Sequence, residues 1–172
     1  FVATTHERGQ IHDAEIALDK DGHILGVHDI FLHDTGAYAP YGLTCALTSQ
    51  ANVLGRYDIR HYYSEFTAVF TNKTIVTPYR GAGRQHGTFV IERMLDLAAK
   101  ELKIDRAEIR RRNFIQPNQF PYHNEIIYQD FAPLVYDSGN YEPLLNEALE
   151  RMDYHNFINV VQPKLRAEGR HV

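Results

Sequence analysis

The sequence contains one cysteine, Cys45, and no tryptophan among its 172 residues. A single thiol cannot form an internal disulfide, nor can it build a four-cysteine zinc or iron–sulfur site. Cys45 lies in an apolar stretch, where cysteine behaves as a small hydrophobic residue more often than as a nucleophile. The chain itself is therefore expected to bind no iron–sulfur cluster and no structural metal.

Long apolar runs and an excess of positive charge are also missing. No run is long enough to span a bilayer, and the amino terminus at Phe1 lacks the pattern of a signal peptide. A formal net charge of −4 and an isoelectric point near 6.2 give no electrostatic reason to expect nucleic acid or an anionic membrane as a partner. We expect a cytoplasmic protein, and the lack of an initiator methionine favours a fragment of a longer chain.

Several common catalytic and cofactor patterns do not occur. The ten histidines follow no zinc or helical ligand-pair spacing, so surface or structural histidines are expected rather than a metal site. There is no nucleophile elbow, no Ser–His–Asp order and no phosphate-binding loop with a lysine. Gly81, Gly83 and Gly87 depart from the glycine spacing of the dinucleotide fingerprint, which argues against a nicotinamide or flavin site.

The composition, with 44% hydrophobic and 23% charged residues, is that of a globular protein with a core. Alternating apolar and polar residues predict a strand over residues 11–18. An Asp-Gly turn ending at Gly22 leads into a second apolar run over residues 23–31, and this pattern predicts a β-hairpin.

The next part of the chain leaves one alternative open. Residues 43–54 are small and apolar, and they fit either a helix or a buried loop. Aromatic and β-branched residues predict a strand that includes residues 66–70, followed by a short strand over residues 74–76.

The strongest helical pattern covers residues 86–102, with apolar side chains recurring on one face. Asp105, with Glu108 three residues later, resembles a capping box that opens a shorter helix, and three consecutive arginines close it at Arg112. Those arginines are expected at a solvated helix end or bonded to neighbouring loops, since no wider basic face accompanies them.

The carboxy-terminal part is predicted as a loop followed by helices. Residues 116–130 carry prolines and amides without a period, so we predict a loop. Asn140 is expected to cap the next helix, and a last helix is expected over residues 155–167, ending at Gly169. The predicted fold class is α+β, with a mixed or antiparallel sheet and packed helices. Residues 1–77 are mainly strands, residues 78–113 hold a Gly-rich loop and two helices, and residues 114–172 hold a loop and the last helices.

The Gly-rich loop is the part of the sequence with the clearest chemistry. Its glycines allow positive φ angles and close approach of another group, while the start of the following helix favours an anion. Arg80 and Arg84 add two cations with planar donor geometry. A purely structural turn is the alternative reading of such spacing. The pattern otherwise predicts a strand–turn–helix cradle for an anionic ligand.

Longer motifs surround this loop, namely Pro78-Tyr79-Arg80-Gly81-Ala82-Gly83-Arg84, Glu92-Arg93, Asp96 and Arg110-Arg111-Arg112-Asn113-Phe114. In these motifs the sequence resembles the molybdenum hydroxylases, which include xanthine dehydrogenase, aldehyde oxidoreductase and the large subunit of aerobic carbon monoxide dehydrogenase. The segments most similar to the carbon monoxide dehydrogenase branch are residues 113–117, 119–122 and 136–141. In copper-containing members of that branch the loop reads Tyr-Arg-Cys-Ser-Phe-Arg, and Gly81 stands here at the cysteine position.

The resemblance implies a role in a larger enzyme. The cofactor would be a molybdopterin with molybdenum, in the cytosine dinucleotide form that bacterial members often carry. The partners would be the rest of the large subunit and subunits that hold iron–sulfur clusters and FAD. The residues implied to line the cofactor or active site are Tyr79, Arg80, Gly81, Ala82 and Gly83. Glu92 and Arg93 would form structural ion pairs, and no catalytic residue is expected in this chain.

The sequence thus predicts part of the molybdopterin-binding region of a molybdenum hydroxylase. The parent enzyme would oxidise an aldehyde, an N-heterocycle or a similar small substrate with oxygen derived from water. Two alternatives stay open. One is carbon monoxide oxidation within the same family, and the other is a non-catalytic folded module or assembly fragment.

Overall fold

The computed structural model describes residues 5–6, 9–39, 41 and 43–172. The chain forms two compact units, one extending to Gly139 and the other from Asn140 to Val172. The first unit contains both β-sheets and three α-helices, and the second contains the carboxy-terminal helices.

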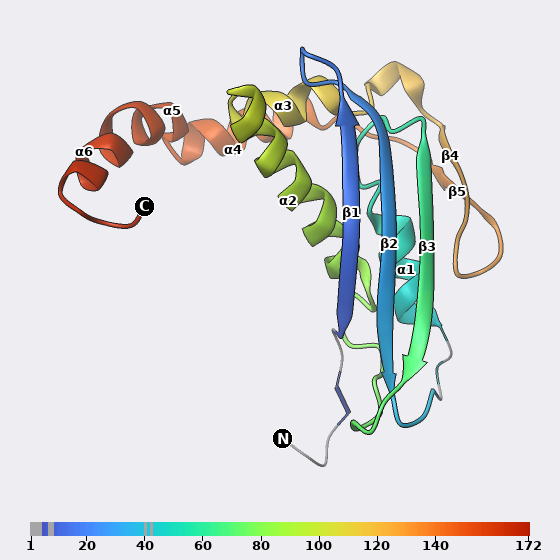
Figure 1. Ribbon diagram of the computed structural model, residues 1–172. Coiled ribbons are helices and arrows are strands. Elements are labelled where there is room, and N and C mark those ends of the chain that lie inside the picture. The colour runs from blue at the N-terminus through green and yellow to red at the C-terminus, as the bar shows by residue number, and fades with distance from the viewer. Residues whose placement is uncertain (1–4, 7–8, 40, 42) are drawn as a thin grey trace. The chain divides into compact units, whose positions relative to one another are not determined.

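The first unit is built on a three-stranded sheet with the strand order β1-β2-β3 (Figure 1). Strands β1 (Gln10–Leu18) and β2 (Ile24–Gly36) form the predicted antiparallel hairpin. Strand β3 (Tyr62–Phe70) runs parallel to β2, and such a pair needs a crossover connection. Helix α1 (Thr44–Asn52) lies in that connection, so the segment that fitted either a helix or a loop is helical. The mixed sheet with packed helices confirms the predicted α+β class.

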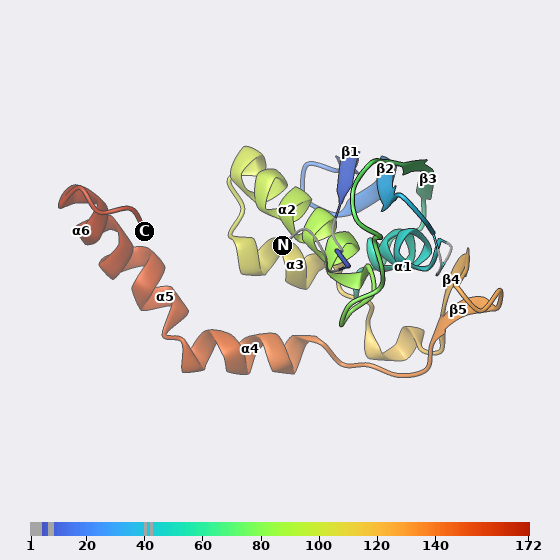
Figure 2. The ribbon, with the colours of Figure 1, turned by 90° about the horizontal axis from the view of Figure 1, so that it is seen from below.

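Helices of the first unit cover one face of this sheet, and no described helix of that unit covers the other (Figure 2). Helix α1 packs against β3, α2 (Arg84–Leu102) packs against β1, and α3 (Arg106–Asn113) packs on α2. The core lies between the sheet and these helices. The largest fully buried apolar side chains are Tyr57, Phe31, Leu54, Ile91, Leu95, Ile109, Ile115 and Val53.

The two predicted helices of this unit are confirmed. Helix α2 begins at Arg84, two residues before the predicted start, and Ile91 and Leu95 face the core as the periodicity predicted. Asp105 caps α3, because its carboxylate accepts the backbone N–H groups of Ala107 at 2.8 Å and Glu108 at 3.0 Å.

Asn113, at the end of α3, joins this helix to the distant hairpin turn. Its side-chain oxygen accepts the N–H of Ile24 at 2.7 Å, and its side-chain nitrogen donates to the carbonyl of Gly22 at 2.7 Å. The same nitrogen also donates to Ile109 at 2.7 Å. Because Asn113 is buried, these bonds satisfy backbone groups that water does not reach.

The short strand predicted over residues 74–76 is wrong. Within the described residues this segment makes one isolated bridge, between Val76 and His6. The reason is that its backbone bonds go to two different places, with Val76 donating to Thr35 at 3.2 Å and His6 donating to Ile75 at 2.9 Å. The β-branched residues of this segment thus lie in a connection between the sheet and the Gly-rich loop.

The loop predicted over residues 116–130 is also wrong in part. It contains a short 3-10 helix, η1 (Pro117–Gln119), and strand β4 (Tyr122–Ile127), which pairs antiparallel with β5 (Pro133–Tyr136). The pairing is irregular between His123 and Ile127, and Glu125 has a φ angle of +54°. Such a bulge interrupts the period of two that would have marked a strand in the sequence.

The second unit contains α4 (Glu142–Arg151), α5 (Tyr154–Asn156), a π-helical turn η2 (Phe157–Val161) and α6 (Gln162–Ala167). The residue before α4 is Tyr141, and no side chain caps this helix, so the predicted cap by Asn140 is wrong. The last three segments follow one another over the range predicted as one helix, and Gly169 has the positive φ angle, +79°, of a helix terminator. No described helix of the chain is long and apolar enough to cross a membrane.

Candidate functional site

The Gly-rich loop forms a tight turn at the start of α2. Gly81, Ala82 and Gly83 have φ angles of +98°, +49° and +101°, so three consecutive residues lie in the left-handed region. Two backbone bonds close the turn, from Ala82 to Tyr79 at 2.6 Å and from Arg84 to Gly81 at 3.0 Å. The prediction that the glycines provide positive φ is confirmed for Gly81 and Gly83, while Ala82 adopts the same conformation without being a glycine.

The group that approaches these glycines closely is helix α1. A Cβ atom on Gly83 would overlap the Cys45 carbonyl oxygen and lie 2.5 Å from the Thr48 hydroxyl. A Cβ atom on Gly87 would lie 2.7 Å from the backbone nitrogen of Val53. Helices α1 and α2 therefore cross so closely that only glycine fits at these two positions of the crossing. The crossing fixes the Gly-rich loop against α1.

Two hydroxyl groups of α1 donate hydrogen bonds to backbone carbonyl groups of the loop. Thr48 donates to the carbonyl oxygen of Ala82, and Ser49 donates to that of Gly83 at 2.8 Å. Both hydroxyl residues are fully buried. Neither was predicted as part of the site, although two small polar residues within an apolar helical stretch are a signal, because buried hydroxyl groups need acceptors.

The two arginines of the loop have different roles. Arg84 folds back over the loop, donating to the Gly81 carbonyl at 3.1 Å and to the hydroxyl of Tyr128. Its guanidinium also lies over the Tyr128 ring, 5.7 Å from the centroid. Arg80 is exposed and makes no ion pair within the described part of the chain. Arg80 is therefore the more exposed of the two cations, and the expectation that both meet a ligand stays a prediction.

The five predicted site residues follow one another in the chain and differ in exposure. Tyr79 and Arg80 are exposed, Gly81 and Ala82 are partly exposed, and Gly83 is buried against α1. The N-terminal end of α2 carries the positive end of the helix dipole, and Arg80 adds a full charge. Both favour an anionic, oxygen-rich group, so the chemistry of these residues fits a cofactor that carries such groups.

Glu92 belongs to a structural cluster and not to this surface. It accepts from Arg110 at 2.7 Å, from Arg56 at 3.1 Å and from the Tyr57 hydroxyl at 2.8 Å. Burial, and then the adjacent Glu92 carboxylate, raise the pKa of Tyr57 above its ordinary value. Structural ion pairing of Glu92 was expected, but the cations are Arg110 and Arg56 and not Arg93.

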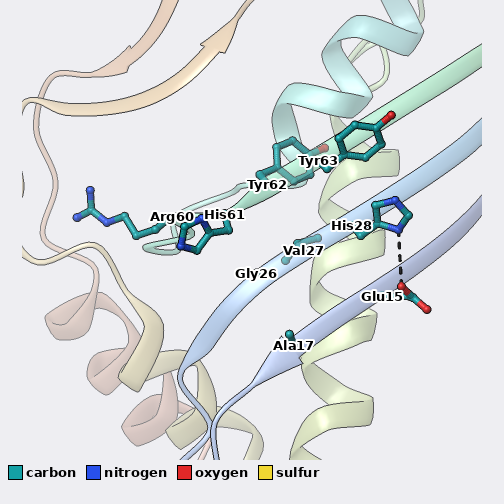
Figure 3. Close-up of a pocket in the computed structure, with 9 residues that line it drawn as sticks. All are labelled: Glu15, Ala17, Gly26, Val27, His28, Arg60, His61, Tyr62 and Tyr63. Carbon is teal, nitrogen blue, oxygen red and sulfur yellow. Dashed lines mark ion pairs between the residues drawn. The ribbon is translucent and has the colours of Figure 1, made fainter.

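A separate hollow lies on the face of the sheet opposite these helices. Its volume is about 480 Å³, and Figure 3 shows Glu15 facing His28 there, with Oε2 and Nδ1 3.7 Å apart. The His28 ring stacks on Tyr63 with centroids 5.2 Å apart. Residues of the Gly-rich loop do not line it. In the described ranges, no group of three or more His, Cys, Asp and Glu side chains could hold a metal ion.

The chain resembles known proteins in sequence and in fold. The sequence profile of the molybdopterin cofactor-binding domain matches residues 1–114. The 6-hydroxypseudooxynicotine dehydrogenase complex subunit gamma of Paenarthrobacter nicotinovorans is 36% identical, and the alignment covers 100% of this chain and 22% of that protein. The carbon monoxide dehydrogenase large chain of Hydrogenophaga pseudoflava is 34% identical, over 89% of this chain and 19% of that one.

A solved structure shows the same arrangement. Quinoline 2-oxidoreductase from Pseudomonas putida 86 superposes with a TM-score of 0.87 at 31% identity, covering 98% of this chain and 21% of that one. This chain belongs to the molybdopterin cofactor-binding domain family and corresponds to a fragment of a molybdenum hydroxylase large subunit. It spans about a fifth of the length of the relatives it matches.

Proposed function

We propose that this chain forms one wall of the molybdopterin site in an enzyme that hydroxylates a ring carbon of an aromatic N-heterocycle. The observation that carries the cofactor-binding part of this proposal is the loop at positions 81–83, where three consecutive residues have positive φ angles beside an exposed arginine. Two of the proteins described above act, by their names, on nitrogen-containing compounds, and this supports the substrate class.

The residues of the chain would serve binding and orientation. Backbone groups of Gly81 and Ala82 would form the wall beside the cofactor, and Arg80 would contribute positive charge near its anionic groups. Tyr79, exposed at the entrance to the turn, would limit where the substrate ring can lie. When bound, a molybdopterin with molybdenum supplies the two-electron oxidation of the substrate carbon, with oxygen taken from water.

The finer features of the parent enzyme belong to the same proposal. The cofactor would be the cytosine dinucleotide form, the electrons would pass to partner subunits with iron–sulfur clusters and FAD, and the enzyme would be cytoplasmic. Residues 1–172 would act together as one part of the cofactor-binding region. Within this part, residues 1–77 would supply strands, residues 78–113 the Gly-rich loop and two helices, and residues 114–172 the loop and helices that follow.

Carbon monoxide oxidation is the second candidate, because a carbon monoxide dehydrogenase large chain is nearly as similar in sequence. The side chain at position 81 favours the first candidate. Copper(I) selects soft thiolate or thioether ligands, and glycine provides neither. Aldehydes form a third substrate class, which the loop does not distinguish from heterocycles.

The test uses the complete enzyme, purified with its partner subunits. Molybdenum and pterin content are measured first, and then hydroxylation of quinoline, nicotine-like pyridines and aldehydes is assayed in water enriched in oxygen-18. We expect stoichiometric cofactor and label in the hydroxylated heterocycle. Turnover of aldehydes with none of the heterocycles would contradict the substrate class, and absence of molybdopterin would contradict the function itself.

A further inference from the structure

A chain of polar side chains runs from the sheet to the Gly-rich loop. Asp29 of β2 contacts Nδ1 of His12 on β1 at 2.9 and 3.1 Å. Nε2 of His12 lies 2.9 Å from the side-chain amide of Gln10, and that amide lies 3.0 Å from the Ser49 hydroxyl of α1. Ser49 lies 2.8 Å from the carbonyl oxygen of Gly83. Asp29, His12, Gln10 and Ser49 are named the relay below.

The two ends of the relay are shielded from water. Asp29 and Ser49 are fully buried, while Gln10 and His12 are half-buried and line a hollow of about 380 Å³, where His12 stacks on Phe31 with centroids 4.4 Å apart. At a buried group such as the Ser49 hydroxyl, a polar contact without a proton between its two atoms is costly, because no water compensates it. The positions of the protons can therefore be deduced from the contacts.

The Ser49 hydroxyl is the starting point, since it has one proton and two oxygen neighbours in the orientation given to the Gln10 amide. It cannot donate to Gly83 and to Oε1 of Gln10 at the same time. If it donates to Gly83, the shorter contact, its oxygen must accept from Gln10. The oxygen and nitrogen of an amide side chain have nearly the same shape, so a half-turn exchanges them without moving any neighbour.

With the amide half-turned, every contact of the relay joins a donor to an acceptor. Nε2 of Gln10 then donates to Ser49 and to Nε2 of His12, and Oε1 accepts from Nδ1 of His33, 3.1 Å away. His12 carries its proton on Nδ1 and donates it to Asp29. The other amide orientation leaves one oxygen–oxygen contact of Ser49 without a proton.

We propose that Ser49 and Gln10 are positioning residues for the Gly-rich loop, with His12 and Asp29 fixing the direction in which the Ser49 proton is donated. The Gly83 carbonyl is thereby held toward α1. Thr48 holds the preceding carbonyl, of Ala82, on the same side. Because a trans peptide unit is planar, the N–H of Gly83 then faces away from α1, toward the exposed side of the loop.

The consequence for the cofactor rests on the proposed function, whereas the direction of the hydrogen bonds does not. By fixing the peptide unit between Gly83 and Arg84, the relay supports the turn, while Thr48, outside the relay, sets the unit whose N–H belongs to Gly83 and would meet a bound anion. The support from the relay would come from β1 and β2, which do not themselves line the predicted surface of residues 79–83.

Isosteric variants of the 172-residue chain test the relay by hydrogen–deuterium exchange of the loop amides. Gln10→Glu keeps the shape but removes the donor, so Ser49 is drawn to the new carboxylate and no longer donates to Gly83, whose carbonyl oxygen keeps the bond from the backbone N–H of His86. We expect about tenfold faster exchange at Ala82 and Arg84, both in this variant and in Ser49→Ala. The double variant should exchange no faster than either single variant, since the relay acts as a unit.

Gln50→Glu is the matched control, because Gln50 lies on α1 and donates to Ser64, away from the loop. It should leave the exchange at Ala82 and Arg84 unchanged. Loop exchange at the wild-type rate in Gln10→Glu, or additive effects in the double variant, would overturn the proposal.

A second measurement uses the unaltered chain, so it does not depend on whether a variant folds. In the unaltered chain labelled with nitrogen-15 at histidine, the contacts of His12 require a proton on Nδ1 and none on Nε2. Finding its proton on Nε2, or on both nitrogens, would overturn the relay. In the complete enzyme, unchanged molybdopterin content in Ser49→Ala despite faster loop exchange would leave the relay intact and contradict only the proposed contact with the cofactor.

Discussion

Two buried polar side chains, Asn113 and Asp34, connect segments that lie far apart in the sequence. Asn113 bonds the end of α3 to the hairpin turn, and Asp34 accepts from Lys73 at 2.6 Å and Thr71 at 2.6 Å. The partners of Asn113 are backbone groups inside the protein that cannot be solvated when its side chain is lost, whereas Asp34 is itself buried and holds the exposed Lys73 by charge. Replacing either side chain should therefore lower the free energy of unfolding.

Asn113→Ala should lower the free energy of unfolding by about 2–4 kcal/mol, because the N–H of Ile24 and the carbonyl of Gly22 lose their only side-chain partner in the described structure. Urea unfolding of the chain measures this loss. Asn118→Ala, at an exposed position of η1, is the control and should change stability by less than about 0.5 kcal/mol. Equal stabilities of the two variants would contradict the role given to Asn113.

Asp34 should make stability depend on acidic pH. Burial alone would raise the pKa of its carboxyl, but the hydrogen bonds from Lys73, Thr71 and the Gly36 amide outweigh it and lower the pKa to about 2. The folded pKa is below the unfolded one, so the stabilisation is present above the unfolded pKa, near 4, and is lost as pH falls toward 2.

The variant Asp34→Asn should therefore be less stable than the wild type by about 1–2 kcal/mol at pH 7, and the difference should close between pH 4 and pH 2. Urea unfolding at several pH values measures both curves. Asp13→Asn, at an exposed position of β1, serves as the control. A difference that stays constant down to pH 2 would show that the ionised carboxyl contributes nothing.

At the level of elements, the central feature is the crossing of α1 and α2 beneath the Gly-rich loop. The crossing needs glycine on α2 and hydroxyl groups on α1, and the two helices come from opposite sides of β3 in the sequence. The loop conformation thus depends on a tertiary contact and not on local preference alone.

The glycines of the loop should differ in their tolerance of alanine. In Gly83→Ala the new Cβ meets backbone atoms of α1, whereas in Gly81→Ala it meets the flexible side chain of Gln85. We expect a loss of about 3 kcal/mol or more for the first and about 1–2 kcal/mol for the second. Urea unfolding of the chain and molybdenum content of the complete enzyme measure the two effects. Equal losses would show that positive φ alone governs both positions.

The sequence predicted the elements whose own patterns are strong. The period of α2 and the Asp-Gly turn between β1 and β2 were sufficient, because local preference and burial agree there. Strand β4 was missed because a bulge breaks its alternation, and residues 74–76 were predicted as a strand because β-branched residues also occur in a connection. Tertiary context decided both cases.

The sequence predicted only those residues of the candidate site that are expected to face the ligand. Tyr79, Arg80 and the glycines stand in one motif, so a sequence pattern can find them. Thr48 and Ser49 support that motif from more than 30 positions away, and only the fold brings them together. Thr48 and Ser49 contact the loop from another helix, so they do not belong to the sequence motif that marks the loop.

At the scale of the whole molecule, the chain spans about a fifth of its relatives' length and contains no candidate catalytic carboxylate at the loop within the described residues. The 172 residues alone should therefore show no hydroxylase turnover with N-heterocycles or aldehydes and an artificial electron acceptor. The complete enzyme under the same conditions is the positive control. Molybdenum-dependent turnover by the 172 residues would mean that this wall of the site is sufficient.

The complete enzyme should contain molybdenum without stoichiometric copper and should not oxidise carbon monoxide at a useful rate. The reason is position 81, where glycine offers no thiolate to copper(I). The structure does bring the backbone of Cys45 beside Gly83, a proximity that the sequence did not predict, and the Cys45 side chain is buried. Elemental analysis and a carbon monoxide oxidation assay should be run on the wild type and on Cys45→Ser. We expect no copper and no carbon monoxide turnover in either. One copper per molybdenum with turnover in the wild type would sink the prediction, and loss of both in Cys45→Ser would identify Cys45 as the ligand in place of position 81.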